Sequence, residues 1–276
     1  MTAMTATTGT IRPARAPRAR AAAPGVDPID AAIDLACRAL QLPTIRHHYD
    51  DIAATALREQ ASYKRFLADL LTAEVAERSE RRKLRLVHEA GFARPKRLED
   101  FDHAANPTVS AEVIGTLANP AWVHGGQPLV LLGDSGTGKS HLLIGIGTAI
   151  AEAGLRVRYS TCANLVNELV EAADEHHLSR TIARYGKVDL LCLDEFGYLE
   201  LDPAGAKLLF QIFTEREERR AIAVASNAPF SEWQRTFTDP RLCAAIVDRL
   251  TFNGHIIETG TSSYRLATTR AKRHPR

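Results

Sequence analysis

The feature that most constrains the fold is a glycine-rich segment at residues 133–140, which reads Gly-Asp-Ser-Gly-Thr-Gly-Lys-Ser. It fits the pattern GxxxxGK[ST]. An apolar run at 129–132 precedes it, and apolar residues at helical spacing follow it: Leu142, Leu143, Ile146, Ala149 and Ile150. A strand, a loop and a helix in this order predict an α/β unit whose loop binds phosphate groups.

The residue types of this loop suit a nucleoside triphosphate. Gly133, Gly136 and Gly138 let the loop turn its backbone N–H groups inward, and the following helix points its positive end at the phosphates. We expect Lys139 to reach the β- and γ-phosphates and Ser140 to supply a ligand for Mg²⁺. The remaining residues of the predicted nucleotide-binding loop are Asp134, Ser135, Thr137 and His141.

An apolar run from Val188 ends in two acids, Asp194 and Glu195. Two carboxylates at the end of a buried strand are costly without a cation. Magnesium explains Asp194, as a direct or water-mediated ligand, and Glu195 is then placed to polarise a water against the γ-phosphate. The pair therefore favours nucleotide hydrolysis, and the alternative is a surface loop that happens to hold two acids.

Two further polar residues follow the next predicted strand, Ala221–Ser226. Asn227 is expected to hold the attacking water, although an Asn that starts a turn before a proline is the simpler alternative. A helix over 241–250 places Arg249 near a molecular edge, where it could stabilise the transition-state charge on a neighbouring subunit. A local salt bridge to Asp248 or Asp239 is the alternative for Arg249.

Short apolar runs alternate with helical patterns in the second half of the chain. The runs lie at 129–132, 156–160, 188–193, 221–226 and 254–258. This alternation predicts a parallel five-stranded sheet flanked by helices. The expected organisation is a disordered basic arm (1–26), a helical N-terminal domain that binds DNA or a partner (27–92), a connector (93–127), the nucleotide-binding core (128–268) and a basic tail (269–276).

The distribution of charge suggests contact with nucleic acid. The segments 1–26 and 265–276 together hold nine of the 35 Lys and Arg residues and no acid, which leaves 26 basic against 33 acidic residues in the body. Solvated disorder is the simpler interpretation of these two basic tails, and contact with nucleic-acid phosphates is the other. Residues 78–97 carry eight basic residues against two acids, and the arginines at 78, 81, 82 and 85 share a helix face. A solvated face with internal salt bridges is the alternative, but so few acids favour a surface that follows phosphates.

Composition limits where such a protein works. No apolar run approaches the roughly 18 residues that a membrane span needs. The four cysteines lie far apart without a CxxC pair, which argues against a zinc site or a disulfide framework and fits a reducing compartment. We expect a cytoplasmic protein without a membrane partner.

Several stretches together resemble the AAA+ ATPases of the helicase-loader branch, and more narrowly the IstB-like ATP-binding proteins of insertion sequences. These stretches are Leu98–Asp102, Gly133–Ser140, Ala163–Leu169, Leu193–Leu199, Ser226–Trp233, Ala245–Leu250 and Ser263–Leu266. The resemblance covers about residues 28–268. It implies an AAA+ core that forms ATP-dependent homo-oligomers on duplex DNA, bends that DNA and recruits a cognate transposase to a target site.

The resemblance also assigns roles to residues. It implies that Lys139, Ser140, Asp194 and Glu195 form the ATP and Mg²⁺ site, that Asn227 is the sensor, and that Arg249 acts in a neighbouring subunit. A C-terminal helical lid is expected to be absent or minimal, which leaves the role of Arg265 as a second sensor open.

Two other functions remain possible at this point. A replicative helicase loader of the DnaC type would have the same core, but its N-terminal helices would grip a helicase instead of duplex DNA. A passive DNA-binding scaffold would have a silent ATP site, and the intact Asp194–Glu195 pair argues against it.

Overall fold

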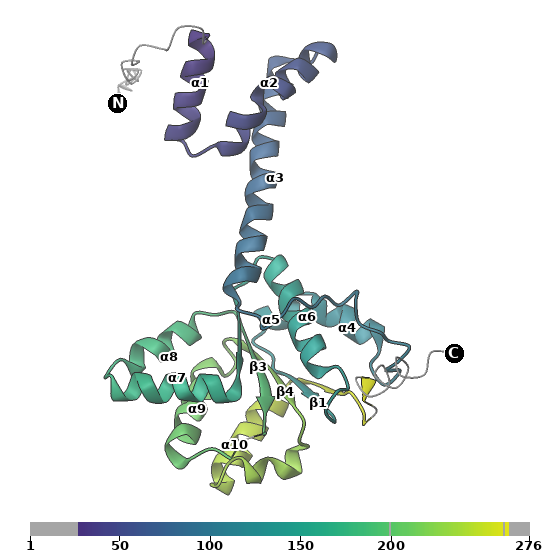
Figure 1. Cartoon of the computed structure of the whole chain (residues 1–276), viewed down its shortest axis with the longest axis vertical. Coiled ribbons are helices and arrows are strands. Elements are labelled where there is room, and N and C mark those ends of the chain that lie inside the picture. The colour runs from purple at the N-terminus through teal and green to yellow at the C-terminus, as the bar shows by residue number, and fades with distance from the viewer. Residues whose placement is uncertain (1–26, 199, 262, 265–276) are drawn as a thin grey trace, which may run out of the picture. The chain divides into compact units, whose positions relative to one another are not determined.

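The computed structural model describes residues 27–198, 200–261 and 263–264 (Figure 1). The arm predicted at 1–26, the tail predicted at 269–276 and Arg265 lie outside these residues. Within them the chain forms two compact units, which divide between Ser79 and Glu80. The expected domain boundary after residue 92 stays a prediction.

The helices and strands follow the alternation that the sequence predicts. Their bounds are α1 Pro28–Ala39, α2 Pro43–Arg58, α3 Tyr63–Glu89, α4 Ala111–Ala118, α5 Ala121–His124, β1 Leu129–Leu132, α6 Lys139–Glu152, β2 Val157–Thr161, α7 Cys162–Asp174, α8 Leu178–Gly186, β3 Leu190–Phe196, α9 Pro203–Arg216, β4 Ala221–Ser226, the 3₁₀-helix η1 Phe230–Arg235, α10 Pro240–Thr251 and β5 His255–Glu258. Among the described residues, no helix combines the length and apolar character that crossing a membrane requires.

The first unit consists of α1, α2 and the beginning of α3, around a small core of Cys37, Ile45 and Leu70. The N-terminus of α2 has no side-chain cap of its own. Glu74 of α3 replaces it, because its Oε2 accepts the N–H groups of Thr44 and Ile45 at 2.8 and 3.1 Å. Burial raises the pKa of Glu74, but these amides and Arg78 outweigh burial and hold it below its ordinary value.

The second unit contains a five-stranded sheet in the order β2-β3-β4-β1-β5. Every pair of neighbouring strands is parallel. The expected parallel five-stranded sheet is therefore confirmed. Because β4 lies between β3 and β1, the carboxyl ends of these three strands meet at one edge.

Both faces of this sheet are buried, as the continuous apolar runs predict. Alternate residues of β1 enter different cores: Leu129 and Leu131 pack on one face, Val130 and Leu132 on the other. Residues of α6, with those of α4 and α5, make up the first core, while α7, α9 and α10 contribute to the second (Figure 1). The sheet is thus fixed from both sides and can hold the loops at its edge in place.

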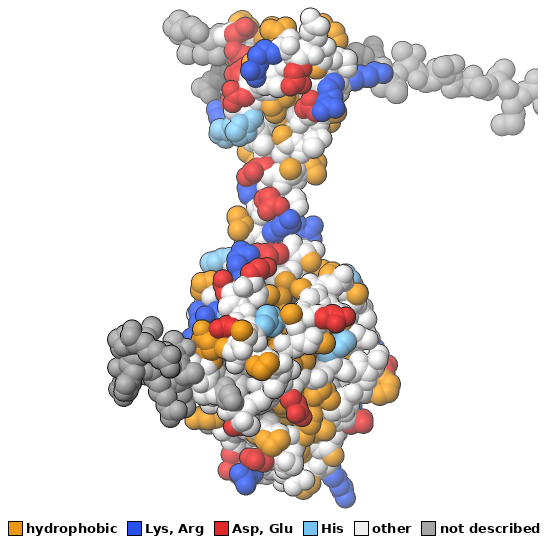
Figure 2. Space-filling view, turned by 90° about the vertical axis from the view of Figure 1, so that its right-hand side faces the viewer, with side chains coloured by type: hydrophobic (Ala, Val, Ile, Leu, Met, Phe, Trp, Pro, Cys, Tyr) orange, Lys and Arg blue, Asp and Glu red, His pale blue; other side chains and the backbone are white. Residues whose placement is uncertain are grey.

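The basic segment at 78–97 is more fully paired than its own acids suggest. Ion pairs join Arg78 to Glu74, Lys83 to Glu80, Arg85 to Glu89 and Arg97 to Glu152. In Figure 2, red acidic side chains stand beside blue basic ones along α3. Glu74 and Glu152 lie outside the counted segment, so the count of acids within 78–97 underestimated the pairing. These pairs are what the alternative, a solvated face with internal salt bridges, predicts, and contact of this segment with phosphates stays a prediction.

Candidate nucleotide-binding site

The loop after β1 has the backbone that its glycines permit. Gly133, Gly136 and Gly138 have φ of 147°, 86° and 99°. Space is a second reason for glycine at all three positions. A Cβ at Gly133 would lie 2.4 Å from Thr259 Oγ1, and one at Gly138 would lie 2.7 Å from the Phe101 ring. Segments far away in sequence therefore pack directly against the loop and leave no room for side chains.

Lys139 begins α6 and is only 5% exposed. Its Nζ donates to the backbone oxygen of Asp134 at 2.7 Å, across its own loop. The loop is also tied to the chain after β5, because Thr137 Oγ1 and Thr259 Oγ1 lie 2.6 Å apart and Asp134 N donates to Gly260 O at 3.0 Å. The ammonium group is thus held at the centre of a folded loop, where bound phosphates would replace its carbonyl partner.

The acid pair lies at a distortion of β3. Pairing with β4 shifts register between Leu193 and Phe196, and Glu195 has φ of 57°. A left-handed conformation is strained for glutamate. With this backbone at Glu195, the two neighbouring side chains differ in exposure: Asp194 is 6% exposed, whereas Glu195 is exposed. The strand can therefore present both carboxylates at the same edge while keeping Phe196 in the core.

Tyr159 of β2 orients the buried member of this pair. Its hydroxyl donates to Asp194 Oδ2 at 2.9 Å, and Glu195 N donates to Asp194 Oδ1 at 2.9 Å. Burial, with the nearby Asp194 carboxylate, raises the pKa of Tyr159 above its ordinary value. The hydroxyl therefore remains a proton donor, and the carboxylate keeps lone pairs for a cation.

These segments surround a cavity of about 530 Å³ at the carboxyl edge of the sheet. Ten of the predicted site residues line it: Ser135, Gly136, Thr137, Gly138, Lys139, Ser140, His141, Asp194, Glu195 and Asn227. Gly133 and Asp134 belong to the loop but not to the lining, and Arg249 lies elsewhere. The volume suits a small-molecule ligand.

The cavity also has lining residues that were not among the predicted site residues. They are Arg94, Lys96, Asp100, Phe101, Asp102, Asn106 and Tyr264. Asn106 Nδ2 donates to the backbone oxygens of Thr137 and Thr259, both at 2.9 Å, and Tyr264 N donates to Gly136 O at 3.0 Å. The one available signal was that the stretches Leu98–Asp102 and Ser263–Leu266 carry the family resemblance. Nothing in the sequence links Arg94 or Lys96 to the loop.

The donors in the cavity suit a magnesium ion. Mg²⁺ prefers oxygen ligands and is usually held by one or two carboxylates together with phosphate oxygens. The buried Asp194 carboxylate and the Ser140 hydroxyl, which follows Lys139 at the start of α6, are such donors on one cavity. The residues present therefore fit the ion.

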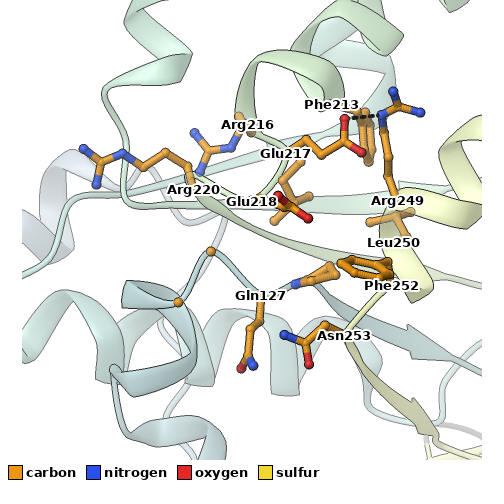
Figure 3. A pocket seen from close by; sticks show the side chains of 14 residues that line it. Gln127, Phe213, Arg216, Glu217, Glu218, Arg220, Arg249, Leu250, Phe252 and Asn253 are labelled. Carbon is orange, nitrogen blue, oxygen red and sulfur yellow. Dashed lines mark ion pairs between the residues drawn. The ribbon is translucent and has the colours of Figure 1, made fainter.

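Arg249 lies at the opposite, amino edge of the sheet, on a second cavity of about 220 Å³ (Figure 3). Its Nε is 2.9 Å from Glu217 Oε2, an ion pair without hydrogen-bond geometry, and its Nη1 donates to Ala245 O at 3.0 Å. The guanidinium also lies 4.8 Å from the centre of the Phe210 ring. A local ion pair is thus present, but its partner is Glu217 and not Asp248 or Asp239.

The sheet topology and the glycine-rich loop are those of a nucleotide-binding protein with the AAA+ fold. DnaA from Aquifex aeolicus, in its AMPPCP-bound structure, shares this fold with a TM-score of 0.54 and 22% identity over 67% of this chain and 57% of DnaA. The family model described as IstB-like ATP binding protein matches residues 36–272, and the chain belongs to that family.

Curated relatives agree with this assignment. An insertion sequence ATP-binding protein of Sinorhizobium fredii is 40% identical over 85% of this chain and 80% of its own length. The insertion sequence IS5376 ATP-binding protein of Geobacillus stearothermophilus is 34% identical over 83% of this chain and 92% of its own length. Both relatives are named as insertion-sequence ATP-binding proteins, which supports the assignment of the chain to the IstB-like ATP-binding family.

Proposed function

We propose that the chain hydrolyses ATP in the cavity at the carboxyl edge of the sheet. Lys139 and the backbone N–H groups of its loop bind the phosphates. Glu195 takes up the proton of the attacking water, and Asn227 holds that water in line with the γ-phosphate. The observation that carries this proposal is that the glycine-rich loop, the acid pair and Asn227, from three separate strands, line one cavity.

Asp194 and Ser140 are the residues that would hold Mg²⁺. When bound, the ion neutralises charge that develops on the phosphate oxygens. The contribution of this chain is to orient the Asp194 carboxylate, through the Tyr159 hydroxyl and the Glu195 amide.

We further propose that the active ATPase is an oligomer on duplex DNA. Arg249 does not line the nucleotide cavity of its own subunit. It lies instead where the amino ends of β1, β4 and β5 meet. In this proposal it leaves Glu217 and stabilises the transition state in an adjoining subunit. ATP then links neighbouring copies, and hydrolysis loosens the assembly.

The proposed assembly selects a target site by holding duplex DNA and recruiting the cognate transposase. The names of the relatives, which are insertion-sequence proteins, favour this role over that of a helicase loader. Binding to DNA is expected to be largely independent of sequence and strongly dependent on salt, because phosphate contacts dominate such binding.

Retention on duplex DNA with and without ATP tests the proposal. Lys139→Ala should lose ATP binding and the ATP-stimulated part of DNA retention. Glu195→Gln should bind ATP, hydrolyse it about 10²-fold more slowly and remain trapped on DNA. Lys207→Ala removes an exposed lysine of α9 and serves as the matched control.

Two results contradict the proposal. Equal DNA retention by the wild type and Lys139→Ala, with and without ATP, excludes coupling between nucleotide and DNA. Hydrolysis by Glu195→Gln at the wild-type rate excludes Glu195 as the base.

A further inference from the structure

Trp233, in the 3₁₀-helix η1, is fully buried beside the nucleotide cavity but does not line it. Its indole N–H donates to two acceptors, Ser226 Oγ at 3.1 Å and Ala228 O at 3.0 Å. A buried indole N–H needs an acceptor, and one carbonyl is enough. Here both acceptors come from the residues that flank Asn227.

Hydrogen bonds also join the two residues that flank Asn227 to each other. Ser226 Oγ donates to Ala228 O at 2.8 Å and accepts from Ala228 N at 3.1 Å. Ser226 is itself completely buried, whereas Asn227 is exposed to the cavity. The indole, the hydroxyl and the Ala228 peptide together fix the backbone on both sides of Asn227, which sets the direction of its amide.

The same indole also packs on the exit of β3. The Trp233 and Phe196 rings have centroids 4.7 Å apart, and Phe196 directly follows Glu195. At the next residue, Gly197, an added Cβ would lie 3.1 Å from Ser226 Oγ and 3.3 Å from the indole. The ends of β3 and β4 thus both pack against the Trp233 indole and the Ser226 hydroxyl.

We infer that Trp233, acting with Ser226, is a positioning residue that sets the placement of Glu195 relative to Asn227. This inference rests on the proposed ATPase function. Neither residue lines the cavity, so they act only through the two groups that do. The left-handed backbone of Glu195 makes such a brace necessary, because a strained residue keeps its conformation only where its surroundings hold it.

Trp233→Phe tests the inference, because phenylalanine keeps an aromatic ring against Phe196 but removes the N–H. Ser226→Ala is the second variant, and it removes the hydroxyl from the same group of hydrogen bonds. Trp122→Phe is the matched control: Trp122 is also buried, with one N–H bond of 2.9 Å to Leu117 O, and it lies outside the cavity. Each protein is first shown to be folded by circular dichroism.

We expect Trp233→Phe and Ser226→Ala to lower kcat for ATP hydrolysis by about tenfold, since small misplacements of reacting groups are costly. The dissociation constant of ATP should stay within about twofold of the wild type, because the phosphate loop is untouched. Trp122→Phe should change neither quantity. In a Glu195→Gln background, Trp233→Phe should cause little further loss of kcat, because both changes act on the same step.

The outcomes separate this inference from the proposed function. If Trp233→Phe and Ser226→Ala match Trp122→Phe in kcat while the wild type hydrolyses ATP, the positioning role is wrong and the ATPase proposal stands. A full additive loss in the Glu195→Gln background also overturns it. If the folded wild type does not hydrolyse ATP, the proposed function fails first.

Discussion

The two edges of the sheet hold their functional candidates in opposite ways. At the carboxyl edge, Glu195 and Asn227 are exposed and face a shared cavity with the loop of Lys139. At the amino edge, the Arg249 side chain is 22% exposed and already engaged with Glu217 and Phe210. The carboxyl edge thus offers groups to a ligand, whereas the amino edge keeps its arginine within the chain.

This difference teaches which half of the proposed ATPase site one chain can build alone. Parallel strands bring their carboxyl ends together, so three separate motifs converge without further help. Within the part of the chain that the structure describes, Arg249 does not line that cavity. In the proposed oligomer a neighbour supplies it, and hydrolysis then depends on assembly.

The largest expected effect tests that dependence directly. Arg249→Ala should reduce ATP hydrolysis by about 10³-fold, because a transition-state charge loses its partner. ATP affinity should stay within about twofold, since Arg249 does not line the cavity. Arg241→Ala, an exposed arginine on the same helix α10, is the control and should keep full activity.

Mixing two inactive variants sharpens the result. In a mixture of Arg249→Ala and Lys139→Ala, subunits of the second kind would supply their arginine to intact cavities of the first. ATP hydrolysis should therefore return in part as the two proteins are combined. If the mixture stays inactive at every ratio, Arg249 does not act in a neighbouring subunit.

The carboxyl edge could be predicted from sequence because its signals are local. A glycine loop before a helix, an acid pair ending a strand and an asparagine after the next strand each occupy consecutive residues. Apolar runs of strand length then predicted the parallel sheet, whose carboxyl edge brings these residues together. The strained backbone of Glu195 was not predictable, because it arises where β3 and β4 lose register.

The amino edge and the connector depend on contacts between distant residues. Glu217 lies 32 positions before Arg249 and carries no motif, so its pairing with Arg249 follows only from the packing of α9 against α10. Arg94 and Lys96 were counted as part of a basic surface, yet they line the cavity. Pairwise side-chain contacts of this kind leave no periodic pattern in a sequence.

Arg94 and Lys96 provide the second test, with a smaller expected effect. The double variant Arg94→Ala/Lys96→Ala should weaken ATP binding by up to about thirtyfold, because partly exposed charges contribute about 1 kcal/mol or less each. Arg97→Ala is the control, since Arg97 pairs with Glu152 at 3.0 Å and lies outside the cavity lining. Titration with a fluorescent ATP analogue at several salt concentrations measures the change.

Comparison of nucleotides shows whether these two cations contact phosphates. If they do, the loss should be largest for ATP, smaller for ADP and smallest for AMP, and it should shrink as salt rises. An equal loss for all three nucleotides would place their effect on the base, the sugar or the loop conformation instead. Unchanged ATP binding would show that lining the cavity is not enough to bind.

The smallest expected effect concerns the ion pair that holds Arg249 in its own subunit. Glu217→Gln keeps the size of the side chain but removes the charge opposite Arg249. An ion pair with one partner about 40% exposed is worth about 0–1 kcal/mol, so releasing it should favour assembly by no more than about fivefold. The protein concentration at half-maximal ATPase activity should fall by that factor, while ATP affinity is unchanged.

Glu218→Gln is the matched control, because Glu218 lines the same small cavity without an ion pair to Arg249 (Figure 3). If only Glu217→Gln lowers the midpoint concentration, the pair competes with the neighbouring nucleotide for the guanidinium. If Glu217→Gln raises the midpoint instead, Glu217 orients Arg249 toward the neighbour, and the carboxylate is then part of the proposed shared site. The direction of the shift in midpoint concentration therefore decides whether Glu217 holds Arg249 within its own subunit or orients it toward the neighbouring nucleotide.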